Sequence, residues 1–272
     1  MGCRPELIVM LTYNDRTVEN AREIFEHCKD SKAKYWGFKE KPLPIEEMKA
    51  LFDRMRECGK KTVLEVVEYD EEECIKGAEI AVECGCDIMM GTMFFESVSE
   101  FCKENKISYL PFVGDVFDRP SVLDGSAEDM IESANEYIKN GAGGIDLLGY
   151  RYLGDPVELN KEVVENLPAP VCVAGSVDSY ERLDEIKKLN PWAFTIGSAF
   201  FDKKFGDDFA EQINKVCEYI EKQTYALTIL MSLRRFYYHR LSCSAEFFSS
   251  NLLRYSKIRS LLCIIPFCSQ VR

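Results

Sequence analysis

Short apolar runs alternate with amphipathic runs along the first 222 residues of the chain. The runs with strand-like composition are 6–13, 33–39, 62–69, 87–94, 108–114, 144–150, 170–177 and 193–200. Between them, apolar residues recur every three or four positions, which is the spacing of an amphipathic helix. Thr17 and Ser126 begin two of these helical runs, so we expect them to be N-caps. Regular alternation of strand and helix predicts consecutive right-handed parallel β-α units.

Eight such units predict an α/β fold, a (β/α)8 TIM barrel that forms a single domain over residues 1–222. About 220 residues is compact for this architecture but sufficient. A doubly wound open sheet is the alternative, and it usually has a glycine-rich turn after its first strand. The corresponding stretch here, TYNDRT at 12–17, contains no glycine. The barrel is therefore favoured.

Residues 223–272 differ abruptly in composition from the segment before them. They hold seven of the 34 Lys and Arg residues but only one of the 46 Asp and Glu residues, so their net charge is +6. Three interpretations are open: a basic membrane-surface segment, a partner-binding extension, or sequence outside the evolved fold. We favour the last, because the change follows directly after the eighth helical pattern.

Composition limits the classes of partner. The net charge of −12 argues against nucleic acid, whose phosphates need clustered Lys and Arg. Twelve cysteines without a recognisable export signal predict reduced thiols and a cytoplasmic location. Cys84 and Cys86 have too few histidines near them to predict a metal site. We expect no cofactor and no membrane association of the barrel, and a homodimer is an open alternative.

Two consecutive predicted strands end in the same pair of residues, Gly175-Ser176 and Gly197-Ser198. In a barrel, strands seven and eight are neighbours and their carboxyl ends lie on the active face. Glycine allows close approach of a ligand, and free N–H groups next to serine hydroxyls bind phosphate. The alternative is that the glycines only relieve crowding in tight turns. The repetition favours a phosphate site built from all four residues.

The segments CVAGSVDSYERLDEI and AFTIGSAFF resemble the closing part of the ribulose-phosphate-binding barrels. That superfamily includes isomerases of histidine and tryptophan synthesis and N-acetylmannosamine-6-phosphate epimerase. The resemblance is strongest over residues 170–201, and it implies the barrel fold and a phosphorylated substrate. The decarboxylase branch has an Asp-x-Lys-x-x-Asp pattern on its third strand, where this chain has LEVVEYD. That departure disfavours the decarboxylase branch.

Chains similar to this one are sometimes labelled 4-hydroxythreonine-4-phosphate dehydrogenase. The enzyme of that name holds a metal with several histidines, whereas residues 1–222 contain only His27. An oxidoreductase would also need a nicotinamide or a flavin. We retain this activity as an alternative.

Strand phase identifies three candidate catalytic residues. In the second predicted strand, Trp36 and Phe38 share one face and should contact the helices, so Lys39 should face inward at the barrel mouth. By the same argument Glu65 and Asp146 point inward, and Glu65 would neighbour Lys39. A structural ion-pair network is the alternative role for these groups.

Candidate substrate contacts lie at other strand ends and in the longest loop. Asn14, Thr92 and Tyr150 follow strands, and Arg119 lies in the predicted lid at 114–125. These residues favour an enzyme that acts on a small phosphorylated sugar or related metabolite, as an isomerase or epimerase by Lys/Glu acid–base chemistry. A Schiff-base aldolase using Lys39 and a non-enzymatic phosphosugar sensor are two competing hypotheses.

Overall fold

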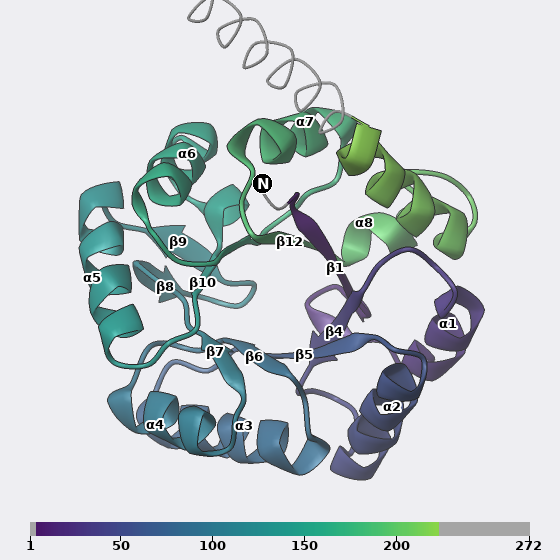
Figure 1. Ribbon diagram of the computed structural model, residues 1–272, viewed down its shortest axis with the longest axis horizontal. Helices are drawn as coiled ribbons and strands as arrows, with labels where there is room; N and C mark the ends of the chain where they lie inside the picture. Colours follow the sequence, from purple (N-terminus) through teal and green to yellow (C-terminus); the bar gives the residue numbers. More distant parts are fainter. Residues whose placement is uncertain (1–3, 223–272) are drawn as a thin grey trace, which may run out of the picture. The chain divides into compact units, whose positions relative to one another are not determined.

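Residues 4–222 are described by a computed structural model, and the segment 223–272 lies outside the described residues. Eight parallel strands form the centre of the molecule, and helices surround them (Figure 1). In sheet order from β10, the strands are β10 (Ile145–Leu147), β11 (Val171–Val173), β12 (Ala193–Ile196), β1 (Glu6–Met10), β4 (Tyr35–Lys39), β5 (Lys61–Val66), β6 (Ile88–Gly91) and β7 (Ser108–Leu110). The predicted (β/α)8 barrel is confirmed.

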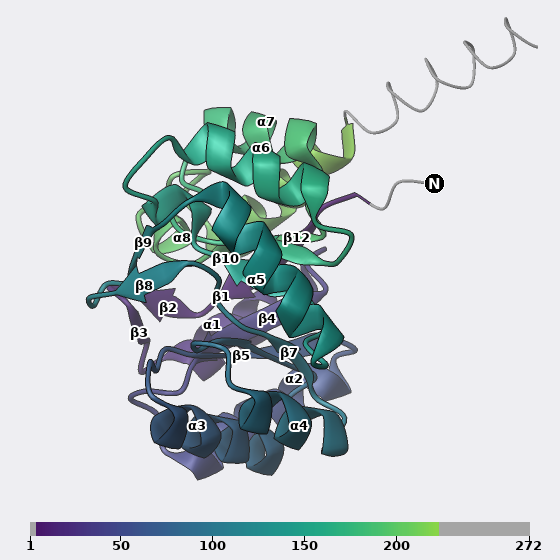
Figure 2. The same ribbon diagram turned by 90° about the vertical axis from the view of Figure 1, so that its left-hand side faces the viewer.

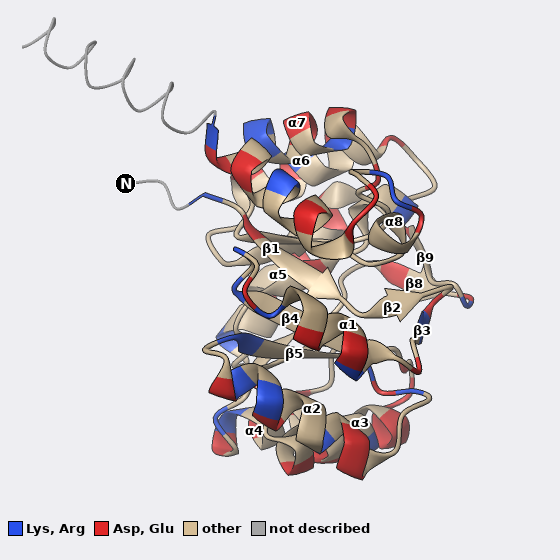
Figure 3. Cartoon of the chain, turned by 90° about the vertical axis from the view of Figure 1, so that its right-hand side faces the viewer, with Lys and Arg blue, Asp and Glu red and all other residues tan. Residues whose placement is uncertain are grey.

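Helices follow the strands in alternation. They are α1 (Ala21–Cys28), α2 (Ile45–Glu57), α3 (Glu71–Cys84), α4 (Glu96–Glu104), α5 (Ala127–Lys139), α6 (Pro156–Asn166), α7 (Tyr180–Leu189), the short α8 (Ser198–Phe201) and a final helix at 209–222. Ser126 and Ser179 begin α5 and α7 as side-chain N-caps. Acidic and basic residues are interspersed on the outer helices (Figure 3).

The ring closes between β7 and β10. Phe112 and Asp146 form a parallel bridge there, and the Asp146 N–H donates a hydrogen bond of 2.9 Å to the Pro111 carbonyl. The strands at this seam are thereby joined through their backbone polar groups, as a closed barrel requires.

Side chains alternate between two apolar layers. Trp36 contacts Phe25 of α1 edge to face, and Phe38 stacks on Phe52 of α2 at 4.2 Å between ring centroids. Inside the barrel a separate cluster contains Ile8, Met10, Val63, Ile88, Met90, Leu110, Cys172 and Ala193. Trp36 and Phe38 thus face the helices as predicted, and Lys39 takes the opposite phase.

Two hairpins interrupt the simple alternation. β2 (Thr12–Tyr13) pairs with β3 (Arg16–Thr17), and β8 (Asp115–Phe117) pairs with β9 (Val122–Asp124). Both hairpins project from the same end of the barrel (Figures 2 and 3). They follow β1 and β7, so they form part of the mouth at the carboxyl ends of the strands.

The hairpins and the strand ends differ from the sequence-based expectation. The predicted strand at 6–13 ends at Met10, and α1 starts at Ala21 after the hairpin. Thr17 is therefore not the helix cap that its position suggested; it belongs to β3. None of the helices among residues 4–222 is long and apolar enough to cross a membrane.

Candidate active site

A pocket of about 130 Å³ opens at the barrel mouth; we call it the central pocket. Its wall comes from the ends of β1, β4, β5 and β12 and from the segments that follow β10, β11 and β12. The lining includes Lys39 and Glu65 together with Gly175, Ser176, Gly197 and Ser198. The structure thus brings the predicted Lys/Glu pair and the two Gly-Ser pairs to one pocket.

Lys39 lies between two carboxylates. Its Nζ donates a hydrogen bond of 2.6 Å to Asp15 Oδ1 and lies 3.5 Å from Glu65 Oε1. Lys39 and Glu65 are direct partners in the β4–β5 register, and Lys39 is only 7% exposed. Burial disfavours the ammonium form, but the carboxylates of Glu65 and Asp15 outweigh it and raise the pKa of Lys39. The lysine is therefore a cation at neutral pH.

Asp15 reaches Lys39 because of the hairpin that carries it. Asn14 and Asp15 form a two-residue turn with φ of 48° and 64°, the left-handed conformation that Asn and Asp tolerate in tight hairpins. Thr17 fixes the hairpin to β4: its hydroxyl donates to the Lys39 carbonyl at 2.7 Å and accepts from the Lys39 N–H at 2.9 Å. The exposed Asn14 side chain lies outside the central pocket.

Asp146 is buried inside the barrel beneath the pocket. It is 1% exposed, pairs in register with Cys172, and neither of its carboxylate oxygens has a hydrogen-bond partner among the described residues. Burial, followed by repulsion from Glu65, raises its pKa well above the usual value. Burial therefore favours the neutral form of the Asp146 carboxyl group. The predicted inward orientation is confirmed, but Asp146 does not line the pocket.

Arg151 lines the pocket and was missed from the sequence. It lies in the 3-10 turn Gly149–Arg151, directly after β10. Its Nη1 donates to the Ser121 carbonyl at 3.2 Å, and its Nη2 lies 3.7 Å from Asp15 Oδ1. Its position shortly after a predicted barrel strand is the sequence signal that could have identified it.

Packing explains the glycines of the two Gly-Ser pairs. A Cβ on Gly175, whose φ is +113°, would lie 2.8 Å from the Tyr150 Cβ; a Cβ on Gly197 would lie 2.6 Å from the Thr12 hydroxyl oxygen. Glycine is required at both positions by protein neighbours, whatever the ligand. The adjacent serines are exposed and line the pocket.

Thr92 and Tyr150, like Asn14, lie outside the central pocket. Thr92 is fully buried, and its hydroxyl shares a 2.7 Å hydrogen bond with the Tyr109 hydroxyl. The Tyr150 hydroxyl donates to Glu185 at 2.9 Å, and the Arg182 guanidinium lies over the Tyr150 ring. Both side chains are occupied by contacts within the protein.

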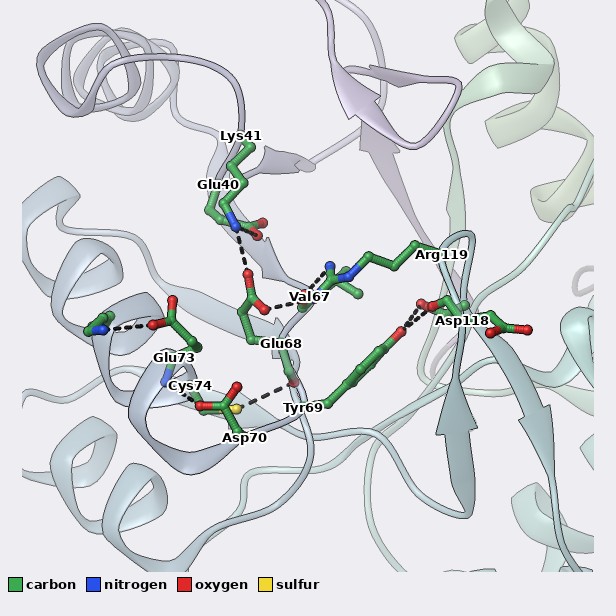
Figure 4. Close-up of polar contacts among 12 residues, drawn as sticks. Glu40, Lys41, Val67, Glu68, Tyr69, Asp70, Glu73, Cys74, Asp118 and Arg119 are labelled. Atoms are coloured by element: carbon green, nitrogen blue, oxygen red, sulfur yellow. Dashed lines mark hydrogen bonds and ion pairs between the residues drawn. The ribbon is translucent and has the colours of Figure 1, made fainter.

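Arg119 is also occupied. It lies between β8 and β9, donates to the Val67 carbonyl, and pairs with Glu68 at 2.7 Å (Figure 4). Its guanidinium lies 5.0 Å from the centroid of the Tyr69 ring. These contacts hold the β8–β9 hairpin against the segment after β5, so Arg119 has a structural role in this conformation.

The donor set does not favour a metal. Residues 4–222 contain no group of three or more His, Cys, Asp or Glu side chains placed to share an ion. His27 is exposed on α1 and pairs with Asp208 at 2.7 Å. Lys39, the two carboxylates beside it and Arg151 are the charged groups that contact one another in the wall of the central pocket.

No protein-family model and no curated protein matches the chain. Solved structures with the same fold include N-acetylmannosamine-6-phosphate 2-epimerase from Clostridium perfringens, which is 12% identical with a TM-score of 0.55 over 73% of this chain and 88% of that one. Orotidine 5′-phosphate decarboxylase from Pyrococcus horikoshii OT3 is 15% identical with a TM-score of 0.56, covering 79% and 99%.

An aldolase is similar to the same extent. The 4-hydroxy-2-oxoglutarate/2-dehydro-3-deoxyphosphogluconate aldolase from TTHB1 is 16% identical, with a TM-score of 0.57 over 79% of this chain and 94% of that one. The chain thus shares the TIM-barrel fold of an epimerase, a decarboxylase and an aldolase. At this identity the likeness shows the fold alone.

Proposed function

We propose that the protein is an enzyme that acts on a small phosphorylated sugar or a related metabolite, as an isomerase or epimerase. The observation that carries the proposal is the position of Lys39 between Asp15 and Glu65 in the wall of the central pocket. Proton transfer at a carbon next to a carbonyl group needs a cation for the oxygen and a base for the proton.

The raised pKa of Lys39 supports the first of these roles. The ammonium group would donate a hydrogen bond to the substrate carbonyl oxygen and stabilise the negative charge that forms there. The Glu65 carboxylate would accept the proton from the neighbouring carbon while the Lys39 ammonium gives its proton to the carbonyl oxygen, which leaves a neutral enediol. Glu65 would then return its proton to the former carbonyl carbon as Lys39 takes the proton of the other enediol hydroxyl, and this completes an isomerisation. No other reactant is needed for this exchange. Glu65 is the base we favour because it is the direct strand partner of Lys39.

The phosphate would bind at the two Gly-Ser pairs. Ser176 and Ser198 are exposed in the wall of the same pocket as Lys39, and each offers a hydroxyl donor. Because their glycine neighbours are needed for packing, the phosphate role is tested at the serines. We expect Ser176→Ala combined with Ser198→Ala to weaken phosphorylated ligands.

The Schiff-base aldolase is the second candidate, since Lys39 is a buried amine in a barrel mouth with a carboxylate beside it. It requires the neutral amine, which the flanking carboxylates disfavour. Borohydride in the presence of substrate separates the two mechanisms. A covalent adduct at Lys39 would establish the aldolase chemistry.

Hydrogen exchange tests the proposed reaction even when the product is unidentified. A panel of phosphorylated ketoses and aldoses is incubated with the protein in D₂O, and loss of the C–H signal next to the carbonyl is followed by proton NMR. We expect exchange with at least one sugar, reduced at least about 100-fold by Glu65→Gln and by Lys39→Met.

Two outcomes would change the proposal. Binding without exchange in the wild type favours the non-enzymatic phosphosugar sensor. Unchanged exchange in Glu65→Gln assigns the base to another residue. Lys61→Met, in an exposed residue at the other end of β5, serves as the control variant and should exchange at the wild-type rate.

A further inference from the structure

A second cavity, of about 450 Å³, opens beside the central pocket; we call it the rim pocket. Its charged lining residues are Asp15, Arg16, Lys39, Glu40, Lys41 and Arg119. Asp15 and Lys39 line both cavities, so their ion pair forms a shared wall. A molecule that reacts at Lys39 can therefore extend in two directions.

The two cavities differ in charge. The central pocket is lined by the cations Lys39 and Arg151 and by four acids: Asp15, Glu65, Asp178 and Asp202. The rim pocket is lined by four basic residues and by only two acids, Asp15 and Glu40. Burial raises the pKa of the Glu40 carboxyl group. An anionic group is consequently favoured in the rim pocket.

The rim cations are not equally available. Glu68 points between Lys41 and Arg119 and lies 2.7 Å from both (Figure 4). Arg16 is exposed, and no ion pair or side-chain hydrogen bond involves it within residues 4–222. Arg16 is thus the rim cation whose charge is left for a ligand. Its place in β3, next to the Asn14-Asp15 turn, holds it near Lys39.

We infer that the substrate carries two anionic ends: a phosphate at the Gly-Ser pairs and a second group, a carboxylate or another phosphate, in the rim pocket at Arg16. This inference rests on the proposed function and narrows its substrate class. The reacting carbon then lies between the two anions, beside Lys39. Arg16 thus takes the role of substrate contact that the sequence had suggested for Arg119.

Three matched ligands test the inference by isothermal titration calorimetry at low ionic strength. Glucitol 6-phosphate has one anionic end, 6-phosphogluconate replaces its terminal hydroxymethyl group with a carboxylate, and glucitol 1,6-bisphosphate adds a second phosphate. We expect at least one two-ended ligand to bind about fivefold or more tightly than glucitol 6-phosphate, because a charge-assisted hydrogen bond is gained. The ligand that shows the preference identifies the second anion.

Arg16→Gln should abolish this preference and leave the affinity for glucitol 6-phosphate unchanged. Arg22→Gln is the matched control: Arg22 is exposed on α1, lines neither the central pocket nor the rim pocket, and should keep the preference. Equal binding of all three ligands, or a preference that survives in Arg16→Gln, would overturn the inference. Neither result would contradict the proposed function on a phosphorylated substrate. Failure of all three ligands to bind would overturn both.

Discussion

Asp146 is a buried acid in surroundings that disfavour its charged form. Its two carboxylate oxygens are buried without hydrogen-bond partners among the described residues, and burial raises its pKa well above the ordinary value. An unfolded Asp ionises near pH 3.9. The pKa of Asp146 is higher in the folded state than in the unfolded state. The free energy of unfolding therefore falls as the pH rises from the unfolded pKa to the folded pKa. This effect costs about 1.4 kcal/mol for each pH unit of the window.

We therefore predict that Asp146→Asn, which cannot ionise, is more stable than the wild type at neutral pH. The difference should grow from about pH 4 upward, as measured by urea denaturation at several pH values. If Asp146 also takes part in proton transfer, the gain in stability will come with lower turnover. A difference independent of pH would show that the wild-type carboxylate is ionised in the fold.

Asp87 provides a control of opposite sign. Its carboxylate bonds to Lys61 at 2.7 Å and to the Thr62 N–H at 2.9 Å. Burial opposes ionisation, but these contacts outweigh it and lower the pKa of Asp87. A carboxyl group whose pKa is lowered in the folded state stabilises the protein at pH values above its unfolded pKa. Asp87→Asn should therefore be less stable than the wild type at neutral pH, and its deficit should shrink as pH falls below about 4.

At the residue scale, strand phase predicted which side chains of a strand face into the barrel. Lys39, Glu65 and Asp146 were identified because polar residues among apolar neighbours in a strand must face away from the helix layer. Asp15 came close to Lys39 through a hairpin turn, and Arg151 through a 3-10 turn. Neither turn has a hydrophobic period, so sequence spacing could not place these side chains.

At the element scale, the β8–β9 hairpin depends on a few contacts with the segment after β5. The Tyr69 hydroxyl donates to the Asp118 carbonyl at 2.7 Å and contacts the Ser121 hydroxyl at 2.8 Å. The Ser121 carbonyl in turn accepts from Arg151 in the central pocket. The hairpin is thereby connected to the site, and Tyr69 holds its tip in place.

Tyr69→Phe should loosen the hairpin without disturbing the barrel. We expect faster amide hydrogen exchange in residues 115–124 and a loss of about 1 kcal/mol in the free energy of unfolding, typical of a lost hydrogen bond. Tyr219→Phe is the control, because its hydroxyl bonds to Asp184 away from the hairpin. Unchanged exchange in residues 115–124 would mean that Arg119 and Glu68 suffice to hold the tip.

Strand positions were predicted more accurately than strand ends. All eight barrel strands lie within the predicted segments or begin one residue before them, but the loops after them contain further apolar residues that extended the pattern. The segment TYNDRT was taken as a connecting turn, although Asn14-Asp15 between Thr-Tyr and Arg-Thr is a hairpin signal. Each strand of this hairpin has only two residues, so Thr12 and Tyr13 were assigned to the longer predicted strand at 6–13.

For the whole molecule, strand–helix alternation and the absence of a glycine-rich turn after the first strand together predicted the architecture, because eight β-α units of this length have few closed arrangements. The charge of the chain did not predict where an anion binds. The net charge is −12, yet basic side chains outnumber acidic ones around the rim pocket. Loop geometry determines that local balance, and loop geometry depends on contacts between segments far apart in sequence.

The last helix of the described residues packs against the barrel core. The final helix, at 209–222, buries Ile213, Val216 and Ile220, and the Gln212 side chain donates to the Phe200 carbonyl at 2.9 Å. We predict that a chain ending at Lys222 remains folded, with a single cooperative thermal transition within a few degrees of the full chain, because apolar burial supplies most of the stability. Circular dichroism melting of both chains measures this. Aggregation of the shorter chain, or loss of its transition, would show that residues 223–272 contribute to the core.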